Sequence, residues 1–402
     1  MSMLLAGLLP KTQIDDNMRV LAFNRHYLPG FKAGGPIRSL SNMVEVLGDE
    51  IEFFIGTTDR DLGDAEPFQD INTHGWVRAG KAKVRYFERQ NISIRAIRAL
   101  IDEVQPDSIY LNSFFDPIFS LRVLVARRIG IVPRVPLLLA PRGEFSAGAL
   151  AVKSVRKLTF LKVAFLSGLA EDVTWHASTA IEARDIYRAI PDGYSSVAVA
   201  PDLGTAPPVG EALAWKPREN GRPLRICFLS RISPMKNLAC ALRALGLAKA
   251  ITVFDIYGPI EDEAYWSECE AIIEDLPPHV RVAYCGEVAH KDVASIFIRY
   301  DLFLLPTFGE NYGHVIVEAL SVGLPVLTSD QTPWNDLSAS GAGWAVATDD
   351  SSVAACIEEA ARWTLPQQVA ARASSIRYAK LILQNDRSLE QNRQLFLQFR
   401  KQ

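Results

Sequence analysis

The sequence predicts an α/β protein made of two doubly wound, Rossmann-like domains that face each other across a cleft. Short apolar, β-branched runs alternate with longer helical segments, which is typical of a parallel sheet covered by helices on both faces. The 402 residues contain two such series, and this length suits two or three domains of about 150 residues each. Because ligands of such sheets bind outside the carboxyl ends of the strands, functional residues are expected just after each strand.

The first series defines an N-terminal domain over residues 18–205. Its expected strands cover residues 19–23, 51–57, 84–87, 108–111, 136–140, 173–176 and 197–200. Residues 1–17 precede the first good strand and are expected to be a disordered extension. Their apolar part, residues 3–9, is short and lacks a basic leader, so it does not predict a secretory signal.

The second series defines a C-terminal domain over residues 206–375. Its expected strands cover residues 224–229, 251–257, 280–285, 302–306, 325–328 and 344–346. Residues 201–222 are rich in Pro, Gly and charged residues and are predicted to link the domains. The tail from residue 351 is expected to be helical with a break at Pro366, and residues 376–402 are expected to pack back on the N-terminal domain.

Composition narrows the class of protein. No apolar run approaches the ~20 residues of a transmembrane helix. The five cysteines form no CxxC pair, which indicates reduced, buried thiols in a cytoplasmic protein without a zinc site or disulfides. No His/Asp cluster has the spacing of metal ligands, so no metal or other cofactor is expected.

One segment between Arg122 and Lys162 is strongly basic, with Glu144 as its single acid. The basic residues are Arg122, Arg127, Arg128, Arg134, Arg142, Lys153, Arg156, Lys157 and Lys162. Such a patch suits an anionic acceptor or peripheral contact with an anionic membrane at its inner face. A solvated helix face explains it equally well. Nucleic acid is not expected as a partner, because aromatic residues do not alternate with the charges.

The strongest candidate site follows the strand at residues 302–306. Glu310 lies just after this strand and begins the string Glu-Asn-Tyr-Gly-His. Glu318 lies eight residues further on, which on a helix is 80° beyond two full turns. A helix is expected to begin near Asn311 or Tyr312. Its free N–H groups, from Asn311 and Tyr312 through Gly313 to His314, would form an anion site. The structural alternative is a helix cap followed by an ordinary helix acid.

Two cations follow the strand at residues 224–229. Arg231 and Lys236 lie in a turn with Pro234, at the start of a predicted helix. Both are expected to project towards the cleft, where they could neutralise an anionic group and the charge that develops on it during a reaction. The alternative is a pair of surface charges.

A glycine pair, Gly34 and Gly35, follows the first strand. Paired glycines let the backbone approach a ligand closely. The spacing is not G-x-G-x-x-G, so a dinucleotide site is not predicted.

Together these residues resemble the family 4 glycosyltransferases, retaining enzymes of the GT-B fold, through the E-x7-E signature, the Arg/Lys pair and the segments 323–326 and 332–337. The resemblance implies that Glu310 binds hydroxyls of the transferred sugar and that Glu318 binds the nucleotide ribose. It further implies that amides near Tyr312 and Gly313 hold the diphosphate. The loop with Gly34 and Gly35 would face the donor phosphates or the acceptor. Family members that build bacterial surface polysaccharides are the most similar.

Acceptor-side residues are expected at later strand ends of the N-terminal domain. The candidates are Asp116, Arg142, Glu144 and His176, with Arg142 standing where many relatives carry a histidine. A structural, hydrogen-bonded histidine explains His176 equally well. Glu182 is interpreted only as the second half of a capping box with Thr179.

The resemblance implies metal-independent transfer of a sugar from a nucleoside-diphosphate sugar to a glycan or lipid-linked acceptor. Retention could follow front-face attack or a covalent intermediate on Glu310. Two alternatives remain: a GT-B-like nucleotide-sugar epimerase, with His176 as its one nominated histidine, and a non-catalytic nucleotide-sugar-binding protein.

Overall fold

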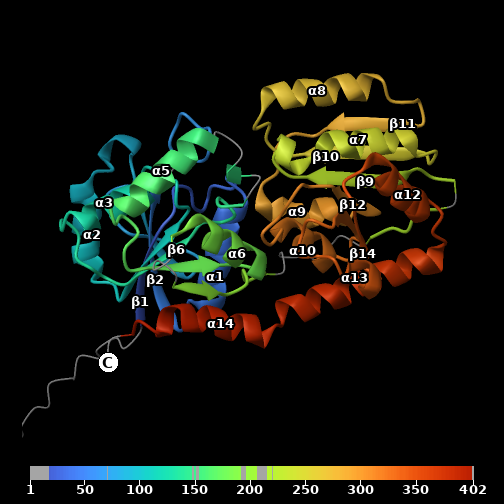
Figure 1. The fold of residues 1–402 in the computed structure, drawn as a ribbon. Helices are drawn as coiled ribbons and strands as arrows, with labels where there is room; N and C mark the ends of the chain where they lie inside the picture. The colour runs from blue at the N-terminus through green and yellow to red at the C-terminus, as the bar shows by residue number, and fades with distance from the viewer. Residues whose placement is uncertain are drawn as a thin grey trace, which may run out of the picture.

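A computed structural model describes residues 18–69, 71–146, 149–150, 154–191, 196–205, 215–219 and 221–400. They form two α/β domains side by side, joined by the segment after residue 200 and again by the C-terminal helices (Figure 1). The expected N-terminal extension and part of the expected linker (residues 206–214 and 220) lie outside the described residues.

The N-terminal domain is built on an eight-stranded sheet in the order β3-β4-β2-β1-β5-β6-β7-β8. Its strands are β1 (Met18–Phe23), β2 (Ile51–Thr58), β3 (Val77–Ala79), β4 (Ala82–Phe87), β5 (Ser108–Asn112), β6 (Leu137–Ala140), β7 (Val173–Ala177) and β8 (Val197–Val199). All neighbouring strands pair in parallel except β3, which runs antiparallel to β4 at the edge. The sequence did not predict β3, because three residues are too few to show a period.

Helices cover both faces of this sheet: η1 (Arg89–Asn91), α1 (Gly35–Leu47), α2 (Ile94–Val104), α3 (Ser120–Arg128), α5 (Ser154–Leu166) and α6 (Ala180–Ala189). One buried cluster joins the sheet to α1 through Leu40 and Val44. The other joins the opposite face to α2, α3, α5 and α6. Both faces are therefore apolar, which explains the continuous apolar runs of the central strands.

The C-terminal domain contains a six-stranded, fully parallel sheet in the order β11-β10-β9-β12-β13-β14. Its strands are β9 (Leu224–Leu229), β10 (Thr252–Tyr257), β11 (Val280–Tyr284), β12 (Leu302–Leu305), β13 (Val326–Ser329) and β14 (Gly343–Val346). Its helices are η2 (Pro234–Lys236), α7 (Leu238–Leu247), α8 (Glu263–Glu274), α9 (His290–Phe297), α10 (His314–Ser321), α11 (Leu337–Ser340) and α12 (Asp350–Ala361). Side-chain caps mark several helix starts; for example, Asp262 accepts from Tyr265 N and Asp349 from Ser352 N.

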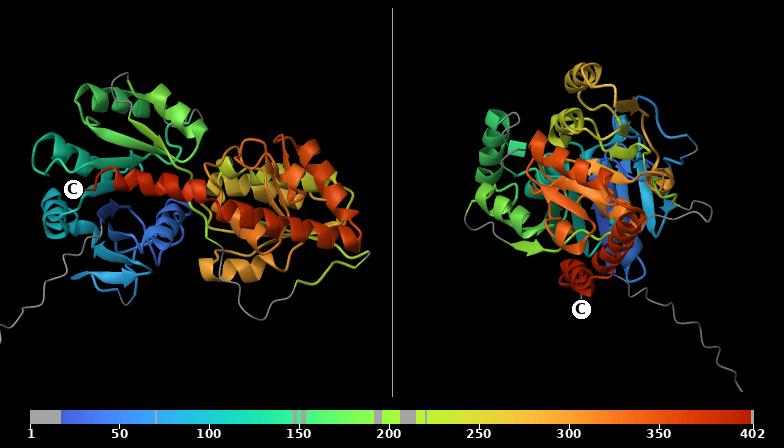
Figure 2. Two further views of the ribbon diagram at one scale, coloured as in Figure 1. Left: turned by 90° about the horizontal axis from the view of Figure 1, so that it is seen from below. Right: turned by 90° about the vertical axis from the view of Figure 1, so that its right-hand side faces the viewer.

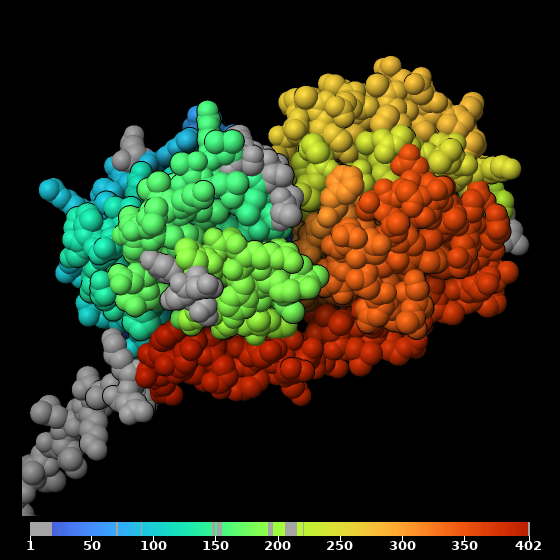
Figure 3. Space-filling view, viewed as in Figure 1, coloured from blue at the N-terminus to red at the C-terminus, as the bar shows by residue number. Residues whose placement is uncertain are grey.

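Two C-terminal helices span both domains. Helix α13 (Leu365–Leu383) packs on the C-terminal domain, and α14 (Asp386–Leu397) packs on the N-terminal domain. Figure 2 and Figure 3 show them running along one side of both domains. The change of domain occurs at Gln384–Asn385, so the expected boundary at residue 376 falls inside α13. Pro366 lies in the first turn of α13, where proline is tolerated, rather than within a helix.

Two expectations from composition concern membranes and thiols. Within the described ranges, no helix is long and apolar enough to cross a membrane. Four of the cysteines are buried, whereas Cys285 is exposed at the end of β11, which corrects the expectation that all five are buried.

Candidate functional site

Lys236 and Glu310 form the centre of the candidate site. Their strands, β9 and β12, are neighbours in the sheet, so the loops after them meet although 74 residues separate the two side chains. Lys236 Nζ donates to Glu310 Oε1 at 2.5 Å. The two side chains are 13% and 14% exposed, so this ion pair remains accessible to a ligand at the carboxyl edge of the sheet.

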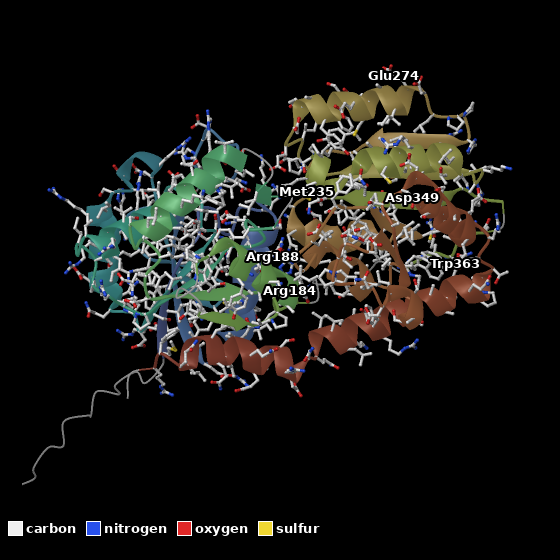
Figure 4. The ribbon with its side chains drawn as sticks, viewed as in Figure 1. Arg184, Arg188, Met235, Glu274, Asp349 and Trp363 are labelled. Atoms are coloured by element: carbon white, nitrogen blue, oxygen red, sulfur yellow. The ribbon has the colours of Figure 1, made fainter. Side chains whose placement is uncertain are left out.

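Backbone contacts hold these two loops together. Asn237, in a left-handed conformation, donates from Nδ2 to Pro306 O at 3.0 Å. Phe308 N donates to Met235 O at 2.9 Å. Met235 lies on the side of the C-terminal domain that faces the N-terminal domain (Figure 4). The ion pair is therefore positioned by fixed loops rather than by two free side chains.

Helix α10 begins at His314, later than the expected start near Asn311 or Tyr312. Gly313 precedes it with φ 79°, a left-handed conformation that glycine adopts without strain. No side chain caps this helix in the described structure. Trp334 Nε1 donates to Tyr312 O at 2.5 Å and fixes the loop. The amides at the start of α10 thus have the arrangement expected of an anion site.

Glu318 is buried on α10 and contacts two residues that the sequence analysis missed. His290 Nε2 lies 3.0 Å from Glu318 Oε1. Arg38 Nε, from the N-terminal domain, lies 4.0 Å from the same oxygen. His290 is the first residue of α9, after the loop that follows β11, and Arg38 lies in the first turns of α1, after β1. Their positions shortly after strands were the feature of the sequence that could have identified them.

Arg231 pairs with a different acid from Lys236. Its Nη1 donates to Glu261 Oε1 at 2.6 Å, and about a third of its side chain is exposed. Gly34 and Gly35 lie opposite, at the start of α1. A Cβ atom placed on Gly34 would be 3.9 Å from Arg231 Nε. The glycine loop and Arg231 therefore face each other across the domain interface.

The His314 side chain joins the domains. Its Nε2 lies 3.0 Å from Ser39 Oγ and its Nδ1 lies 3.3 Å from Asn42 Nδ2, both on α1. Ser39 Oγ also donates to Asp202 Oδ2 at 2.7 Å, in the segment that leaves β8. Burial lowers the pKa of His314, although Asp202 opposes this shift. A neutral ring that donates from Nε2 and accepts at Nδ1 satisfies these partners.

Glu182 provides a second contact between the domains. Thr179 caps α6 as expected, by accepting from Glu182 N. The Glu182 carboxylate does not complete a capping box, however. Its Oε1 accepts from Gly143 N at 2.6 Å and from Asn311 Nδ2 at 3.2 Å, and its Oε2 accepts from Ser178 N at 2.8 Å. The side chain of Asn311 therefore contacts the N-terminal domain.

His176 and Arg142 do not present free side chains to an acceptor. His176 is 1% exposed, with Nδ1 2.9 Å from Tyr110 Oη and Nε2 2.8 Å from Ala200 O. Arg142 donates to Tyr110 Oη and pairs with Asp202. These bonds tie the ends of β5, β6 and β7 to the linker and use the polar atoms of both residues inside the domain, which for His176 agrees with the structural alternative.

Glu144 and Asp116 are likewise engaged within the N-terminal domain. Glu144 accepts from Phe114 N at 2.6 Å, and burial raises its pKa to about 7. Asp116 accepts from Phe119 N at 2.8 Å and pairs with Arg25 Nε at 3.0 Å. Both carboxylates stabilise the turns after β5 and β6, so the structure does not support their placement on the acceptor side.

The basic segment has fewer free charges than its sequence indicates, but it has an apolar face. Arg127 and Arg142 are buried, Arg134 pairs with Asp172, and Lys153 lies outside the described residues. Exposed basic side chains include Arg128, Arg156 and Lys162. Helix α5 also exposes four large apolar side chains, which are 47–89% exposed: Val155, Leu158, Val163 and Leu166.

A cavity of about 360 Å³ lies at the hinge rather than at the Lys236–Glu310 pair. Its walls come from the segment at residues 201–204, from Tyr312 and Trp334, and from the junction of α13 and α14. Neither Lys236 nor Glu310 lines it, and the sequence did not predict it.

No group of three or more His, Cys, Asp and Glu side chains in the described structure is arranged to hold a metal ion. One Asp-x-Asp pair, Asp59 and Asp61, escaped the sequence analysis. Asp61 Oδ2 accepts from Phe31 N at 2.6 Å and from Lys32 N at 3.0 Å, and Asp59 pairs with Arg60. The Asp61 carboxylate therefore shapes the loop before α1.

Comparison with known protein families gives a match in the C-terminal domain. Residues 210–380 match the family Glycosyl transferases group 1. A 105-residue segment is 29% identical to the D-inositol 3-phosphate glycosyltransferase of Mycobacterium tuberculosis (strain ATCC 25618 / H37Rv). That segment is 26% of this chain and spans only 22% of the relative's length.

Solved structures match almost the whole chain at low identity. Sucrose-phosphate synthase from Thermosynechococcus elongatus has a TM-score of 0.69 at 16% identity, covering 95% of this chain and 99% of that one. Anabaena HepE, in complex with UDP and glucose, has a TM-score of 0.67 at 17% identity, with coverages of 94% and 98%. WaaG, a glycosyltransferase involved in lipopolysaccharide biosynthesis, has a TM-score of 0.60 at 14% identity, with coverages of 90% and 95%. The chain therefore has the GT-B fold, and its C-terminal domain matches the family Glycosyl transferases group 1.

Proposed function

We propose that this chain is a retaining glycosyltransferase that moves a sugar from a nucleoside-diphosphate sugar to a glycan or lipid-linked acceptor in bacterial surface-polysaccharide synthesis. The observation that carries the proposal is the Lys236–Glu310 pair beside the start of α10, within a group 1 domain. The similarity to HepE, crystallised with UDP and glucose, supports a nucleotide-sugar donor. The similarity to WaaG supports the pathway.

The donor would lie along the carboxyl edge of the C-terminal sheet. Lys236, Arg231 and the first amides of α10 would neutralise the diphosphate and the charge that develops on it during bond cleavage. Glu310 would bind the sugar and Glu318 the ribose. Because protein cations and amides supply the neutralisation, we propose that transfer needs no metal ion.

Retention has two routes that these residues serve equally. In front-face attack, the leaving phosphate takes the acceptor proton while Glu310 holds the sugar. In the other route, the Glu310 carboxylate forms a covalent glycosyl intermediate. Mass spectrometry of the rapidly quenched enzyme would separate them, because only the second route adds a sugar to the peptide that contains Glu310.

Contact with an anionic membrane at its cytoplasmic face is part of the proposal. The exposed face of α5 combines apolar side chains such as Val163 and Leu166 with Arg156 and Lys162. Apolar side chains that enter the headgroup region, flanked by cations, are the features of an interfacial helix. The contact would bring a lipid-linked acceptor close to the cleft.

The epimerase alternative loses its support in the structure. It needs an acid or base in the N-terminal half, and the nominated histidine, His176, is 1% exposed with both ring nitrogens engaged. A non-catalytic binding protein would bind the donor without turnover, which the following experiment distinguishes.

The test is a calorimetric titration with UDP, GDP, ADP and CMP in EDTA, followed by a product assay with the sugar donor of the preferred base. We expect saturable binding of one nucleotide, and its loss in Arg231→Ala. Binding that requires a divalent metal would contradict the metal-independent site. Tight binding with neither transfer nor hydrolysis of the donor would indicate a binding protein.

A further inference from the structure

Arg38 approaches the proposed donor site from the opposite domain. It lies in the first turns of α1, and its Nε is 4.0 Å from Glu318 Oε1 on α10. The side chains of Arg38 and Glu318 are only 15% and 10% exposed. This contact therefore joins the two domains at the carboxylate proposed to bind the nucleotide ribose.

The Arg38 guanidinium has more donors than partners. A guanidinium carries five N–H donors, and a separation of 4.0 Å is too long for a hydrogen bond. Among the described residues, Glu318 is its one ionic contact and no hydrogen bond of the guanidinium is seen. Burial accordingly lowers the pKa of Arg38, with Glu318 only partly opposing the shift. The guanidinium therefore has N–H donors left to bind an anion that enters between the domains.

We propose that Arg38 is the contact of the N-terminal domain with the nucleotide, donating to the phosphate that is attached to the ribose. This inference rests on the proposed function. That phosphate is bonded to the ribose through a single oxygen, so a guanidinium beside the ribose-binding Glu318 is within its reach. Planar guanidinium groups bind phosphate oxygens through two parallel hydrogen bonds.

The path of the glycine loop agrees with this placement. Gly34 faces Arg231, which is proposed to bind the diphosphate, and Arg38 faces Glu318 one turn later on the same helix. The start of α1 thus runs from the diphosphate end of the proposed donor site to its ribose end. Since the phosphate would be held from both domains, donor binding would favour the closed orientation of the domains.

The experiment compares three ligands of the base that the unaltered chain prefers: the nucleoside, its monophosphate and its diphosphate. We expect Arg38→Met to weaken monophosphate and diphosphate binding at least tenfold, about 1.4 kcal/mol, and to change nucleoside binding less than about twofold. Arg38→Lys should weaken binding of the two phosphorylated ligands less than Arg38→Met does, because lysine keeps the positive charge but cannot form two parallel hydrogen bonds. If Arg38→Met does not fold, the three ligands are compared with Arg38→Lys instead.

Lys32→Met is the matched control. Lys32 Nζ pairs with Glu287 across the domains at 3.2 Å and with Asp64 of its own domain at 2.9 Å, away from Glu318, so its loss tests the removal of another cation at the domain interface. We expect Lys32→Met to affect the three ligands equally. Equal losses for the three ligands in Arg38→Met, or none, would overturn the role of Arg38 while leaving the donor site intact. No binding of any nucleotide by the unaltered chain would overturn the proposed function as well.

Discussion

At the scale of residues, the candidate site is a set of charges paired across neighbouring strand ends. Lys236 pairs with Glu310, Arg231 with Glu261, and Glu318 lies between His290 and Arg38. Pairing fixes the side chains before a ligand arrives, which is the pre-organisation that electrostatic catalysis requires.

The first prediction concerns the central pair. Glu310→Ala and Lys236→Ala should each lower transfer at least tenfold, about 1.4 kcal/mol in the activation barrier, because each would remove a contact proposed for the sugar or the leaving group. Initial rates with saturating donor measure this. Asp350→Ala, which breaks an ion pair with Arg243 on α7, is the control and should retain the wild-type rate. Wild-type rates in both site variants would refute the site.

The second prediction concerns His176 and pH. Burial lowers its pKa to about 4 in the folded chain, from 6.5 for the free side chain. Between these values the unfolded chain binds more protons, so this stabilising contribution is complete above about pH 6.5 and is lost as pH falls towards 4. From pH 7 to pH 4, the unfolding free energy should fall by on the order of 3 kcal/mol more in the unaltered chain than in His176→Gln. Urea unfolding at both pH values measures the difference, and parallel curves would contradict it.

At the scale of elements, helix α5 differs from its neighbours. Its buried side packs on the sheet through Leu161 and Phe165, yet its outer side exposes Val163 and Leu166 at 59% and 89%. An outer helix face usually carries polar residues, so this face is the one that suits the proposed membrane contact.

The third prediction tests that face. Replacing both Val163 and Leu166 with Glu should weaken binding to anionic vesicles at least ~tenfold, since it removes buried apolar area and adds repulsive charge. Vesicle sedimentation at low and high salt measures it. Leu381→Glu is the matched control, because Leu381 on α13 is 68% exposed on another surface. Equal binding by all three proteins, or none by the unaltered chain, would remove the membrane contact.

At the scale of the whole molecule, the relative orientation of the domains depends on a few polar contacts and on one helix. His314 bonds to α1, Asn311 bonds to Glu182, and α14 inserts Phe396 against Phe53 and Tyr110 of the N-terminal core. Interfaces that rest on such contacts usually permit domain motion.

The fourth prediction separates this interface from general stability. His314→Phe keeps a ring beside Tyr312 but removes the bonds to Ser39 and Asn42. Its radius of gyration should rise in small-angle scattering and its stability should fall by about 1–3 kcal/mol. His279→Phe is the control, because it removes a hydrogen bond to Ala248 O inside the C-terminal domain. It should lower stability without changing the scattering, and equal scattering in both variants would contradict the prediction.

The sequence by itself determined the two-domain α/β architecture and the donor-side residues Glu310, Glu318, Arg231 and Lys236 as candidates. Strand periodicity is local, and the residues that follow parallel strands necessarily meet at one edge of the sheet. The positions of these residues after strands were therefore enough to predict that Arg231, Lys236 and Glu310 lie at the cleft, whereas the Lys236–Glu310 pair was seen only in the structure.

Only the tertiary structure shows which polar residues form their hydrogen bonds within a domain and thereby stabilise the fold. His176 and Arg142 follow strands just as Lys236 does, yet they are buried by the linker and by their neighbours. It also decided that Arg38 meets Glu318 and that Glu182 meets Asn311. These pairs lie in different domains, and the orientation of two domains depends on contacts between residues far apart in the chain, which no local pattern of the sequence encodes.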